Sequence, residues 1–208
     1  MKESDADKRK YKADCTGCRI SQRKNKNVKE RGGIIELDGN WILNHYGSGE
    51  GFLGWLSLQP KDHILSLTDL SKNQVKSFIS NIQNIDKGLR KFWSKNFKKD
   101  PIELVYMVYF FESLFEKGPD SYHLHMHLIP RPKSFRKLKI FSDVKCNTKS
   151  GNVIVEKITT EPIGWRIYLA SKCSNFPPKY RVPKDKVGNN RAKKLMEFLR
   201  KTLPKNDC

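Results

Sequence analysis

His123-Leu124-His125-Met126-His127-Leu128-Ile129 is the stretch of this sequence that decides its fold and its chemistry. Histidines alternate with apolar residues, and successive side chains of a β-strand point to opposite faces. The pattern therefore predicts a strand that buries Leu124, Met126 and Leu128 and presents three imidazoles on its other face. Because the whole chain has only five histidines, three at this spacing indicate a functional cluster.

Two kinds of chemistry use such a cluster. A neutral imidazole can attack phosphorus to give a covalent phosphohistidine, while neighbouring imidazoles orient it, stabilise phosphoryl oxygens or protonate a leaving group. A His-x-His pair on a strand can also place two nitrogens on one Zn²⁺. Both interpretations stay open from the triad alone, beside the simpler one of solvated histidines without chemistry.

A second chemical motif lies near the amino terminus, in Cys15-x-x-Cys18. Two thiolates at this spacing form half of a tetrahedral zinc site, and the other half must come from elsewhere in the chain. The remaining candidate donors are His45, His63 and the triad. A redox dithiol is less favoured because the strand and helix that flank such motifs are missing, and two ordinary thiols are the plain alternative.

Composition limits the class of protein. A chain of 208 residues with 37% hydrophobic residues can bury one core with a small appendage. A formal net charge of +19 favours polyanionic partners such as nucleotides, nucleic acid or an anionic surface. We expect a cytoplasmic protein without a membrane partner, because no stretch is long and apolar enough to span a bilayer and the charged amino terminus lacks a signal-peptide core. Five cysteines, an odd count, indicate reduced thiols.

Hydrophobic patterning predicts an α+β domain with a mostly antiparallel sheet and one long helix. Residues 1–13 are charged and are expected to be a flexible lead-in, and the basic run from Arg19 to Arg31 is expected to be a loop. Asp38-Gly39 is a turn signal between two β-forming segments. The expected strands are Ile34–Leu37, Trp41–Tyr46, Phe52–Leu58, a buried Ile102–Phe111 and the histidine strand.

Ser71-x-x-Gln74 is a capping box that begins the predicted long helix, which should run to about Phe97 and cover one face of the sheet. After Pro132 the character changes: nineteen lysines and arginines stand against six acidic residues. We expect residues 133–208 to form a basic extension packed on the core. It should contain short strands at Val153–Ile158 and Trp165–Leu169, a loop at Asn175–Pro183 and a terminal amphipathic helix.

The triad resembles the signature of the histidine triad (HIT) superfamily of nucleotide hydrolases and transferases, His-Φ-His-Φ-His-Φ-Φ with Φ apolar, at every position. Upstream, Ile42-Leu43-Asn44-His45-Tyr46 is similar to a strand of the diadenosine polyphosphate phosphorylase branch. Leu58-Gln59-Pro60-Lys61-Asp62-His63 resembles the Pro-Lys-x-His motif of the family. The resemblance covers residues 14–132, which we therefore expect to be a HIT-like catalytic domain.

The resemblance implies a division of labour among the candidate residues. Many bacterial relatives hold one structural zinc, and the matching ligands in this chain are Cys15, Cys18, His63 and His123. The middle histidine, His125, would be the nucleophile that takes up a nucleoside monophosphate, and His127 would bind phosphoryl oxygens or assist the leaving group. Asn44 would approach the ribose.

Two departures from the family pattern concern rate and substrate. A further histidine that the family often carries before Pro-Lys-x-His is replaced here by Trp55, which could stack on a base or belong to the core. Near the triad, the Gln followed by Ser or Thr that reaches the phosphate is replaced by Pro119-Asp120-Ser121. Ser121 is the candidate for that phosphate contact.

The expected function is hydrolysis or transfer at the α-phosphorus of a dinucleoside polyphosphate or nucleoside phosphoramidate, through a nucleotidyl-histidine. One alternative is removal of adenylate from nucleic-acid ends, as in the aprataxin branch, which the basic charge favours. The other is a catalytically silent nucleotide- or RNA-binding protein, with the basic extension as a candidate nucleic-acid surface. The resemblance also implies a homodimer.

Overall fold

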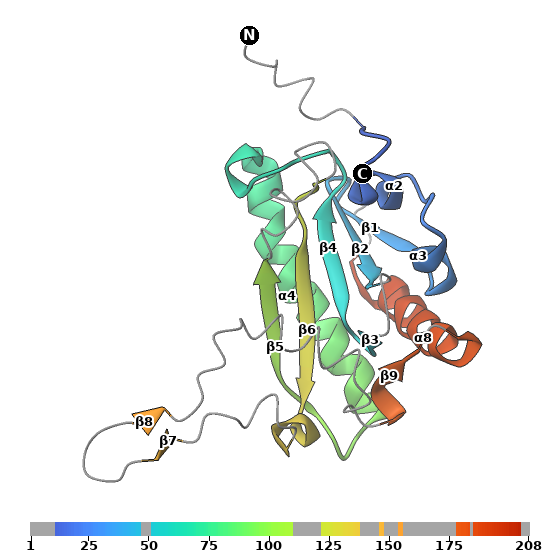
Figure 1. Ribbon diagram of the computed structural model, residues 1–208, viewed down its shortest axis with the longest axis vertical. Helices are drawn as coiled ribbons and strands as arrows, with labels where there is room; N and C mark the ends of the chain where they lie inside the picture. The colour runs from blue at the N-terminus through green and yellow to red at the C-terminus, as the bar shows by residue number, and fades with distance from the viewer. Residues whose placement is uncertain are drawn as a thin grey trace.

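A computed structural model of the chain describes residues 11–46, 51–109, 122–137, 146–147, 154–155, 178–183 and 185–204. Its centre is a five-stranded antiparallel sheet in the order β1-β2-β4-β6-β5 (Figure 1). The strands are β1 (Ile34–Leu37), β2 (Trp41–His45), β4 (Leu56–Pro60), β5 (Ile102–Tyr109) and β6 (Met126–Pro132). The predicted α+β class and the antiparallel sheet are confirmed for the described residues.

The turn between β1 and β2 explains why these two strands pair as a hairpin. Leu37 lies opposite Trp41, so the chain reverses within three residues. Asp38 and Gly39 both have positive φ, 44° and 74°, which is the backbone that hairpin turns need and that Asp and Gly accept most readily. The Asp38 carboxylate also accepts a hydrogen bond from the Asn40 backbone N–H, at 3.2 Å.

Helix α4 (Lys72–Asn96) covers one face of the sheet and confirms the predicted long helix. Its capping box is complete: Gln74 N–H donates to Ser71 Oγ at 3.2 Å, and Ser71 N–H donates to the Gln74 side chain at 2.9 Å. Leu89 and the other apolar residues of its inner face are fully buried in the core.

The terminal helix, α8 (Lys186–Thr202), packs beside α4 at the β1 side of the sheet (Figure 1). Gly88 of α4 allows this close approach, because a Cβ there would lie 2.8 Å from a methyl carbon of Leu199. Leu195, Met196 and Leu199 are completely buried. The predicted terminal helix and its packing on the core are therefore found in the structure.

The predicted loop from Arg19 to Arg31 is wrong, because two short helices occupy it: α2 (Thr16–Ser21) and α3 (Lys26–Glu30). Each has a side-chain cap on its first turn. Cys18 N–H donates to the Cys15 sulfur at 3.4 Å, and Val28 N–H donates to the Asn25 amide oxygen at 3.1 Å. Helices of one turn have too few residues for a periodic apolar pattern, so only the caps could have indicated them.

The predicted strand Phe52–Leu58 is divided. Gly51–Phe52 form β3, which pairs with β9 (Arg181–Val182), and the chain turns before β4 begins at Leu56. Gly54 makes the turn, with φ of 87° and with Pro130 and Trp93 so close that a Cβ would lie 2.7 Å and 2.9 Å from them. The turn lets β3 leave the line of β4 and pair with β9, which belongs to the carboxy-terminal part of the chain.

Strand β5 differs from the expected buried strand because it lies at the edge of the sheet. Leu104 and Met107 are 45% and 54% exposed. The last two residues of the predicted strand, Phe110 and Phe111, lie outside the described residues.

The extension from residue 133 is described only in parts. Short elements are η3 (Lys133–Lys137), β7 (Cys146–Asn147), β8 (Ile154–Val155) and η4 (Pro178–Tyr180), while η1 (Leu67–Asp69) precedes α4. The predicted strand at Trp165–Leu169 and residues 1–10 of the lead-in lie outside the described residues. None of the described helices has the length and apolarity needed to cross a membrane.

Asp100, at the turn after α4, binds two parts of this extension to the core. Its carboxylate accepts hydrogen bonds from the backbone and hydroxyl of Ser134 at 2.8 Å and 2.6 Å, and from the Tyr180 hydroxyl at 2.5 Å. Lys179 adds an ion pair at 3.0 Å. Although burial opposes ionisation, these donors bring the pKa of Asp100 down to about 2.

Candidate metal centre and active site

The histidine stretch has the alternation that its sequence predicts. Leu124, Met126 and Leu128 are buried, and β6 begins at Met126, so the first two histidines lie just before the strand. The register places His127 opposite Ser57 of β4 and Val108 of β5. His127 therefore faces away from the core of apolar residues under α4, on the side of the sheet that α4 leaves uncovered.

Four buried side chains meet at the start of this stretch: Cys15, Cys18, His63 and His123. Their four candidate ligand atoms all lie within 4.8 Å of one another. The Nδ1 atom of His123 is 3.6 Å from both sulfurs, and the Nδ1 atom of His63 is 3.2 Å from the Cys18 sulfur. A tetrahedral zinc ion keeps neighbouring sulfur and nitrogen ligands about 3.5 Å apart, so this donor set fits zinc in both type and spacing.

The backbone around the cluster orients its imidazole. Nε2 of His123 is 2.9 Å from the carbonyl oxygen of Pro60, so this nitrogen carries the proton and Nδ1 is left as the ligand atom. Gly17, between the two cysteines, packs directly on the ring, since a Cβ there would lie 2.4 Å from His123 Cβ. Gln59 donates to the Gly17 carbonyl at 2.8 Å and fixes α2 to β4.

The two thiols differ in their readiness to ionise. The hydrogen bond between the two thiols lowers the pKa of Cys18, whereas the same bond, together with burial, raises the pKa of Cys15. Of the two thiols, Cys18 is therefore the one that ionises more readily. Because thiolates are the form that binds zinc, the lowered pKa of Cys18 favours metal binding by this residue.

His125 has its ring oriented by the main chain. Its Nδ1 lies 2.9 Å from the carbonyl oxygen of His123, which can only accept, so Nδ1 carries the proton. The lone pair is then on Nε2, and the side chain is partly exposed. Burial lowers the pKa of His125 below its usual 6.5 and keeps the ring neutral. These are the properties of a nucleophilic imidazole.

His127 lies next to it, with ring centroids 4.9 Å apart and ring planes perpendicular. Its Nδ1 is 3.0 Å from the indole Nε1 of Trp55, which donates to it. Trp55 is stacked on Tyr46, with centroids 4.5 Å apart, and both rings meet the imidazole edge-on. Burial holds the pKa of His127 well below 6.5.

The candidate nucleotide contacts have different outcomes. Asn44 is opposite Ser57, which in turn is opposite His127, so the three residues form one row across β2, β4 and β6. Two strand spacings, about 10 Å, separate the ends of this row. The Asn44 side chain donates to the His45 carbonyl at 3.1 Å, and its oxygen has no partner among the described residues. Ser121 lies outside the described residues.

His45 does not join either group of histidines. It is completely buried, and burial together with the nearby Arg31 guanidinium lowers its pKa to about 3. Its Nδ1 lies 3.1 Å from the Tyr46 carbonyl. Residue types alone left His45 as a candidate zinc donor, and the structure places it outside the cluster.

Sequence reasoning missed the partners that set the imidazole orientations. The Pro60 and His123 carbonyls have no signal in the sequence, because any residue carries one. Gln59 could have been found, since a buried polar residue in a strand is unusual. Trp55 was singled out as a departure from the family, but its hydrogen bond to His127 was not expected.

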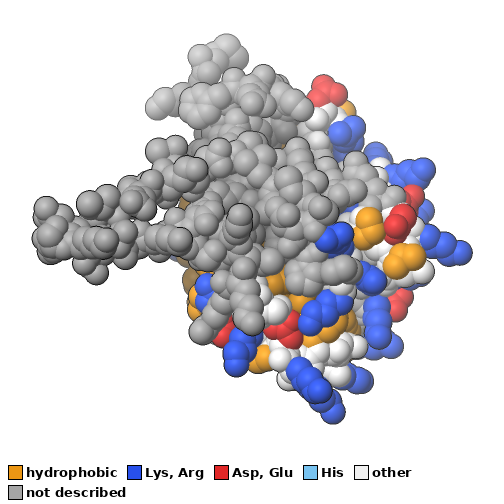
Figure 2. All heavy atoms as spheres, turned by 60° about the horizontal axis from the view of Figure 1, so that its bottom comes forward, with side chains coloured by type: hydrophobic (Ala, Val, Ile, Leu, Met, Phe, Trp, Pro, Cys, Tyr) orange, Lys and Arg blue, Asp and Glu red, His pale blue; other side chains and the backbone are white. Residues whose placement is uncertain are grey.

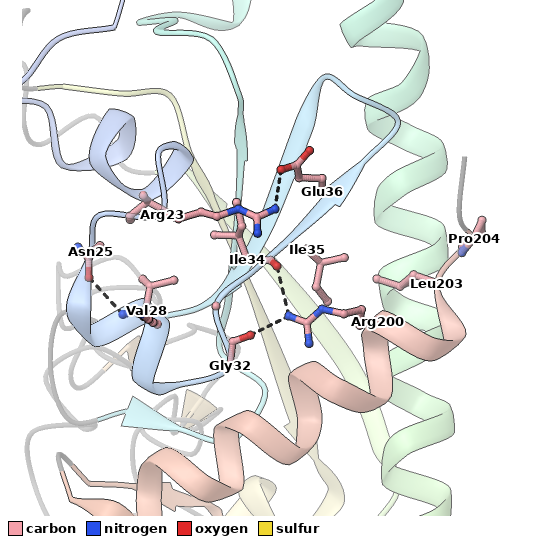
Figure 3. A pocket seen from close by; sticks show the side chains of 13 residues that line it. Arg23, Asn25, Val28, Gly32, Ile34, Ile35, Glu36, Arg200, Leu203 and Pro204 are labelled. Atoms are coloured by element: carbon pink, nitrogen blue, oxygen red, sulfur yellow. Dashed lines mark hydrogen bonds and ion pairs between the residues drawn. The ribbon is translucent and has the colours of Figure 1, made fainter. Parts of the chain in front are cut away.

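A large cavity of about 770 Å³ lies elsewhere, along the free edge of β1 (Figure 3). Its walls come from α2, α3, β1 and the end of α8, and two guanidinium groups cross it. Arg23 reaches Glu36 at 2.9 Å, and Arg200 donates to the carbonyls of Gly32 and Ile34 at 2.7 Å and 3.3 Å. β2 and β4 separate this edge from the histidine strand, so the cavity is distinct from the imidazole pair.

Comparison with known proteins gives matches among solved structures. No family model matches the chain, and no curated protein does. A Hit-like protein involved in cell-cycle regulation from Bartonella henselae is 19% identical, with 60% of this chain and 84% of that one covered and a TM-score of 0.44. A Zn-bound histidine triad family protein from Mycobacterium smegmatis is 13% identical, with 90% and 94% covered and a TM-score of 0.46.

A HIT family hydrolase from Legionella pneumophila is 18% identical, with 55% of this chain and 90% of that one covered and a TM-score of 0.32. These similarities concern the fold.

Proposed function

We propose that this chain is a histidine triad enzyme that cleaves nucleotides at the α-phosphorus through a covalent nucleotidyl-His125 intermediate. The observation that supports this proposal most strongly is the 2.9 Å hydrogen bond from His125 Nδ1–H to the His123 carbonyl. It fixes the tautomer with a lone pair on Nε2, next to a second neutral imidazole. A nucleophile oriented in this way needs no separate base to activate it.

In the first step a bond forms between His125 Nε2 and the α-phosphorus, and the bond from phosphorus to the leaving group breaks, with its electron pair going to the leaving group. The ring then carries the nucleotidyl group on Nε2 and a proton on Nδ1, so it is positively charged. The His123 carbonyl oxygen, 2.9 Å from Nδ1, stabilises that charge. In the second step water attacks phosphorus and the P–N bond breaks with its electron pair returning to Nε2, which restores neutral His125, and the water loses a proton to solvent as the nucleoside monophosphate is released.

The neighbouring residues would bind the substrate. His127 has its proton on Nε2, because its Nδ1 accepts from Trp55, and this N–H can donate a hydrogen bond to a phosphoryl oxygen. Asn44 lies in the same row across the sheet, and its amide oxygen lacks a partner among the described residues, which suits a ribose hydroxyl. Ser121 stays the candidate for a further phosphate contact.

Cys15, Cys18, His63 and His123 would hold a structural Zn²⁺. Four protein ligands in a buried cluster leave no position for water or substrate, which is typical of a structural site. The ion would join α2 and the end of β4 to the start of the histidine stretch. It would thereby support the carbonyl that orients His125, without taking part in the reaction.

Two partners belong to the same proposal. A homodimer is supported by exposed apolar residues on the edge strand β5 and on α4, including Met107 and Ile79, which are 54% and 56% exposed. Light scattering should give twice the mass of the chain, whereas a monomer at micromolar concentration would contradict it. Nucleic acid stays the second candidate partner, and most of the basic extension that would bind it lies outside the described residues; in Figure 2 the Lys and Arg side chains of the described residues are spread over the visible face with Asp and Glu between them.

The test is to incubate the protein with an α-labelled dinucleoside polyphosphate, adenosine phosphoramidate and adenylated DNA. We expect an acid-labile, base-stable protein adduct with one or both of the first two substrates, and none in His125→Ala. An adduct or turnover only with adenylated DNA would favour the deadenylation alternative. Nucleotide binding without any adduct would favour the silent binding protein and contradict the proposal.

A further inference from the structure

The hydrogen bond between Trp55 and His127 restricts the chemistry of His127. An indole N–H can donate but cannot accept, so the His127 Nδ1 that it meets at 3.0 Å must be unprotonated. His127 therefore holds its single proton on Nε2. Adding a second proton would bring two N–H groups face to face and remove the only acceptor in the pair.

Packing keeps the indole in place. Trp55 is 1% exposed, stacks on Tyr46 with an interplanar angle of 12° and contacts Phe52 with centroids 5.8 Å apart. The backbone holds it as well, because the Trp55 carbonyl accepts from Tyr46 N–H at 2.8 Å. A ring fixed on two sides cannot turn away to let His127 take up a proton at Nδ1.

We propose that Trp55 is a positioning residue that keeps His127 a neutral hydrogen-bond donor and so selects leaving groups that depart without a proton. The proposal rests on the function proposed above. When a phosphoanhydride is cleaved, the P–O bond breaks and the oxygen leaves as a phosphate anion, which needs no acid. When a phosphoramidate is cleaved, the P–N bond breaks and the nitrogen needs a proton to leave as an amine. His127 cannot supply that proton in the state that Trp55 imposes.

The desolvation of His127 acts in the same direction, since the buried ring already resists a positive charge. Among the described residues, the rings of His125, Tyr46 and Trp55 pack against it. Substrates joined by phosphoanhydride bonds, such as dinucleoside polyphosphates, are therefore the expected class. Phosphoramidates with amine leaving groups should be cleaved more slowly.

The tautomer can be measured directly in the wild-type protein. Nitrogen-15 NMR of the imidazoles should show His127 with an unprotonated Nδ1 and a protonated Nε2 from pH 6 to pH 8. His127→Gln serves to assign the signal. A proton on Nδ1, or an imidazolium within this range, would overturn the proposal whether or not the protein is active.

Selectivity is tested with Trp55→Phe, which removes the donor and keeps an aromatic ring. We expect the ratio of kcat/KM for a dinucleoside tetraphosphate to that for adenosine phosphoramidate to fall by about tenfold, the value of one hydrogen bond. The phosphoramidate rate of the variant should also rise as the pH falls from 8 to 6. An unchanged ratio and an unchanged pH profile would contradict the role of Trp55.

Trp93→Phe is the matched control, because Trp93 is an equally buried indole that packs on Phe97 and Tyr180, away from the imidazole pair. For this variant the ratio of kcat/KM for the dinucleoside tetraphosphate to that for adenosine phosphoramidate should stay at the wild-type value. A fall as large as that of Trp55→Phe would show that the selectivity depends on core packing in general and not on the Trp55 N–H. If wild type cleaves neither substrate, the proposed function is wrong and the selectivity with it. The NMR result then still decides the tautomer.

Discussion

His123 and His125 are two residues apart and use opposite ring nitrogens. In His123 the Pro60 carbonyl binds Nε2 and leaves Nδ1 to the two thiols, whereas in His125 the His123 carbonyl binds Nδ1 and leaves Nε2 available. Both rings are neutral imidazoles in one stretch of chain. A backbone carbonyl, by the ring nitrogen that it meets, thus decides which nitrogen of a histidine keeps the lone pair for a metal ion or a phosphorus atom.

The two ends of the histidine stretch, the cluster around His123 and the pair of His125 and His127, also differ in their surroundings. The cluster around His123 is enclosed by α2 and by the chain after β4, with all four side chains buried. The pair of His125 and His127 lies on the sheet face, with His125 partly exposed. We therefore expect the first end to determine stability and metal content, and the second to determine turnover. The following changes test whether these properties separate.

The largest effect is expected from His125→Ala. Loss of the nucleophile should lower kcat by a factor on the order of 10⁴ or more, because no other group in the pair has a lone pair directed by a carbonyl. Zinc content and the thermal midpoint should stay close to wild type. Steady-state kinetics and metal analysis check both. A variant that retains more than a tenth of wild-type kcat would show that the nucleophile lies elsewhere.

The Cys15→Ser/Cys18→Ser double variant tests the other end. We expect zinc to fall from one equivalent to none and stability to fall by about 5 kcal/mol, or roughly 10–20 °C in Tm. Mass spectrometry under native conditions and calorimetry measure the two quantities. Unchanged zinc content in this variant would refute the metal site.

Gly17→Ala is a milder change at the same end. Its methyl group would meet the His123 ring at 2.4 Å, so the ring or α2 must shift, at a cost of about 1–3 kcal/mol. Zinc should be released at a lower chelator concentration, while kcat of the folded protein stays within about twofold of wild type. Chelator titration gives the first value. Gly33→Ala is the control for steric contact, since a Cβ there meets nothing within 4 Å and its cost, about 1–2 kcal/mol, comes from the positive φ of 73° alone.

The smallest effect on zinc content and on kcat is expected from Asp100→Asn, because Asp100 lies outside both the metal cluster and the imidazole pair. Stability should fall by about 1–3 kcal/mol at neutral pH, because Ser134, Tyr180 and Lys179 lose a charged acceptor. The folded pKa of Asp100, about 2, is below its usual 3.8, so its contribution is complete above pH 4 and is lost as the pH falls from about 4 to 2.

Denaturant unfolding measured against pH should therefore bring the two proteins together in that window. A constant difference down to pH 2 would mean that the Asp100 charge is not what stabilises the turn. A change in zinc content or kcat would break the separation between the two ends.

Patterns that repeat along the chain were predictable from the sequence. The hairpin at Asp38-Gly39 and the capped helix from Ser71 each follow from local spacing, and the structure confirms them. The histidine strand is confirmed only from Met126 onward, because His123 and His125 precede it. Cys15 and Cys18 predicted half a zinc site, but only the resemblance to a family joined them to His63 and His123. The structure brings the same four residues together.

What could not be predicted depends on contacts between distant segments. The edge position of β5, the turn at Gly54 and the bond from Trp55 to His127 are set by which strands become neighbours. Local composition contains no information on that order. The tautomers are the clearest case, because they depend on where two carbonyl oxygens lie in the folded chain.

The bond from Arg200 to the carbonyls of Gly32 and Ile34 joins residues up to 168 positions apart. During synthesis from the amino terminus, β1 leaves the ribosome long before α8 exists. The edge of β1 then lacks this partner until the residues up to Arg200 have been made, and an open edge is where nascent chains pair wrongly with one another. Arg200 can therefore bind these carbonyls only after α8 has been made.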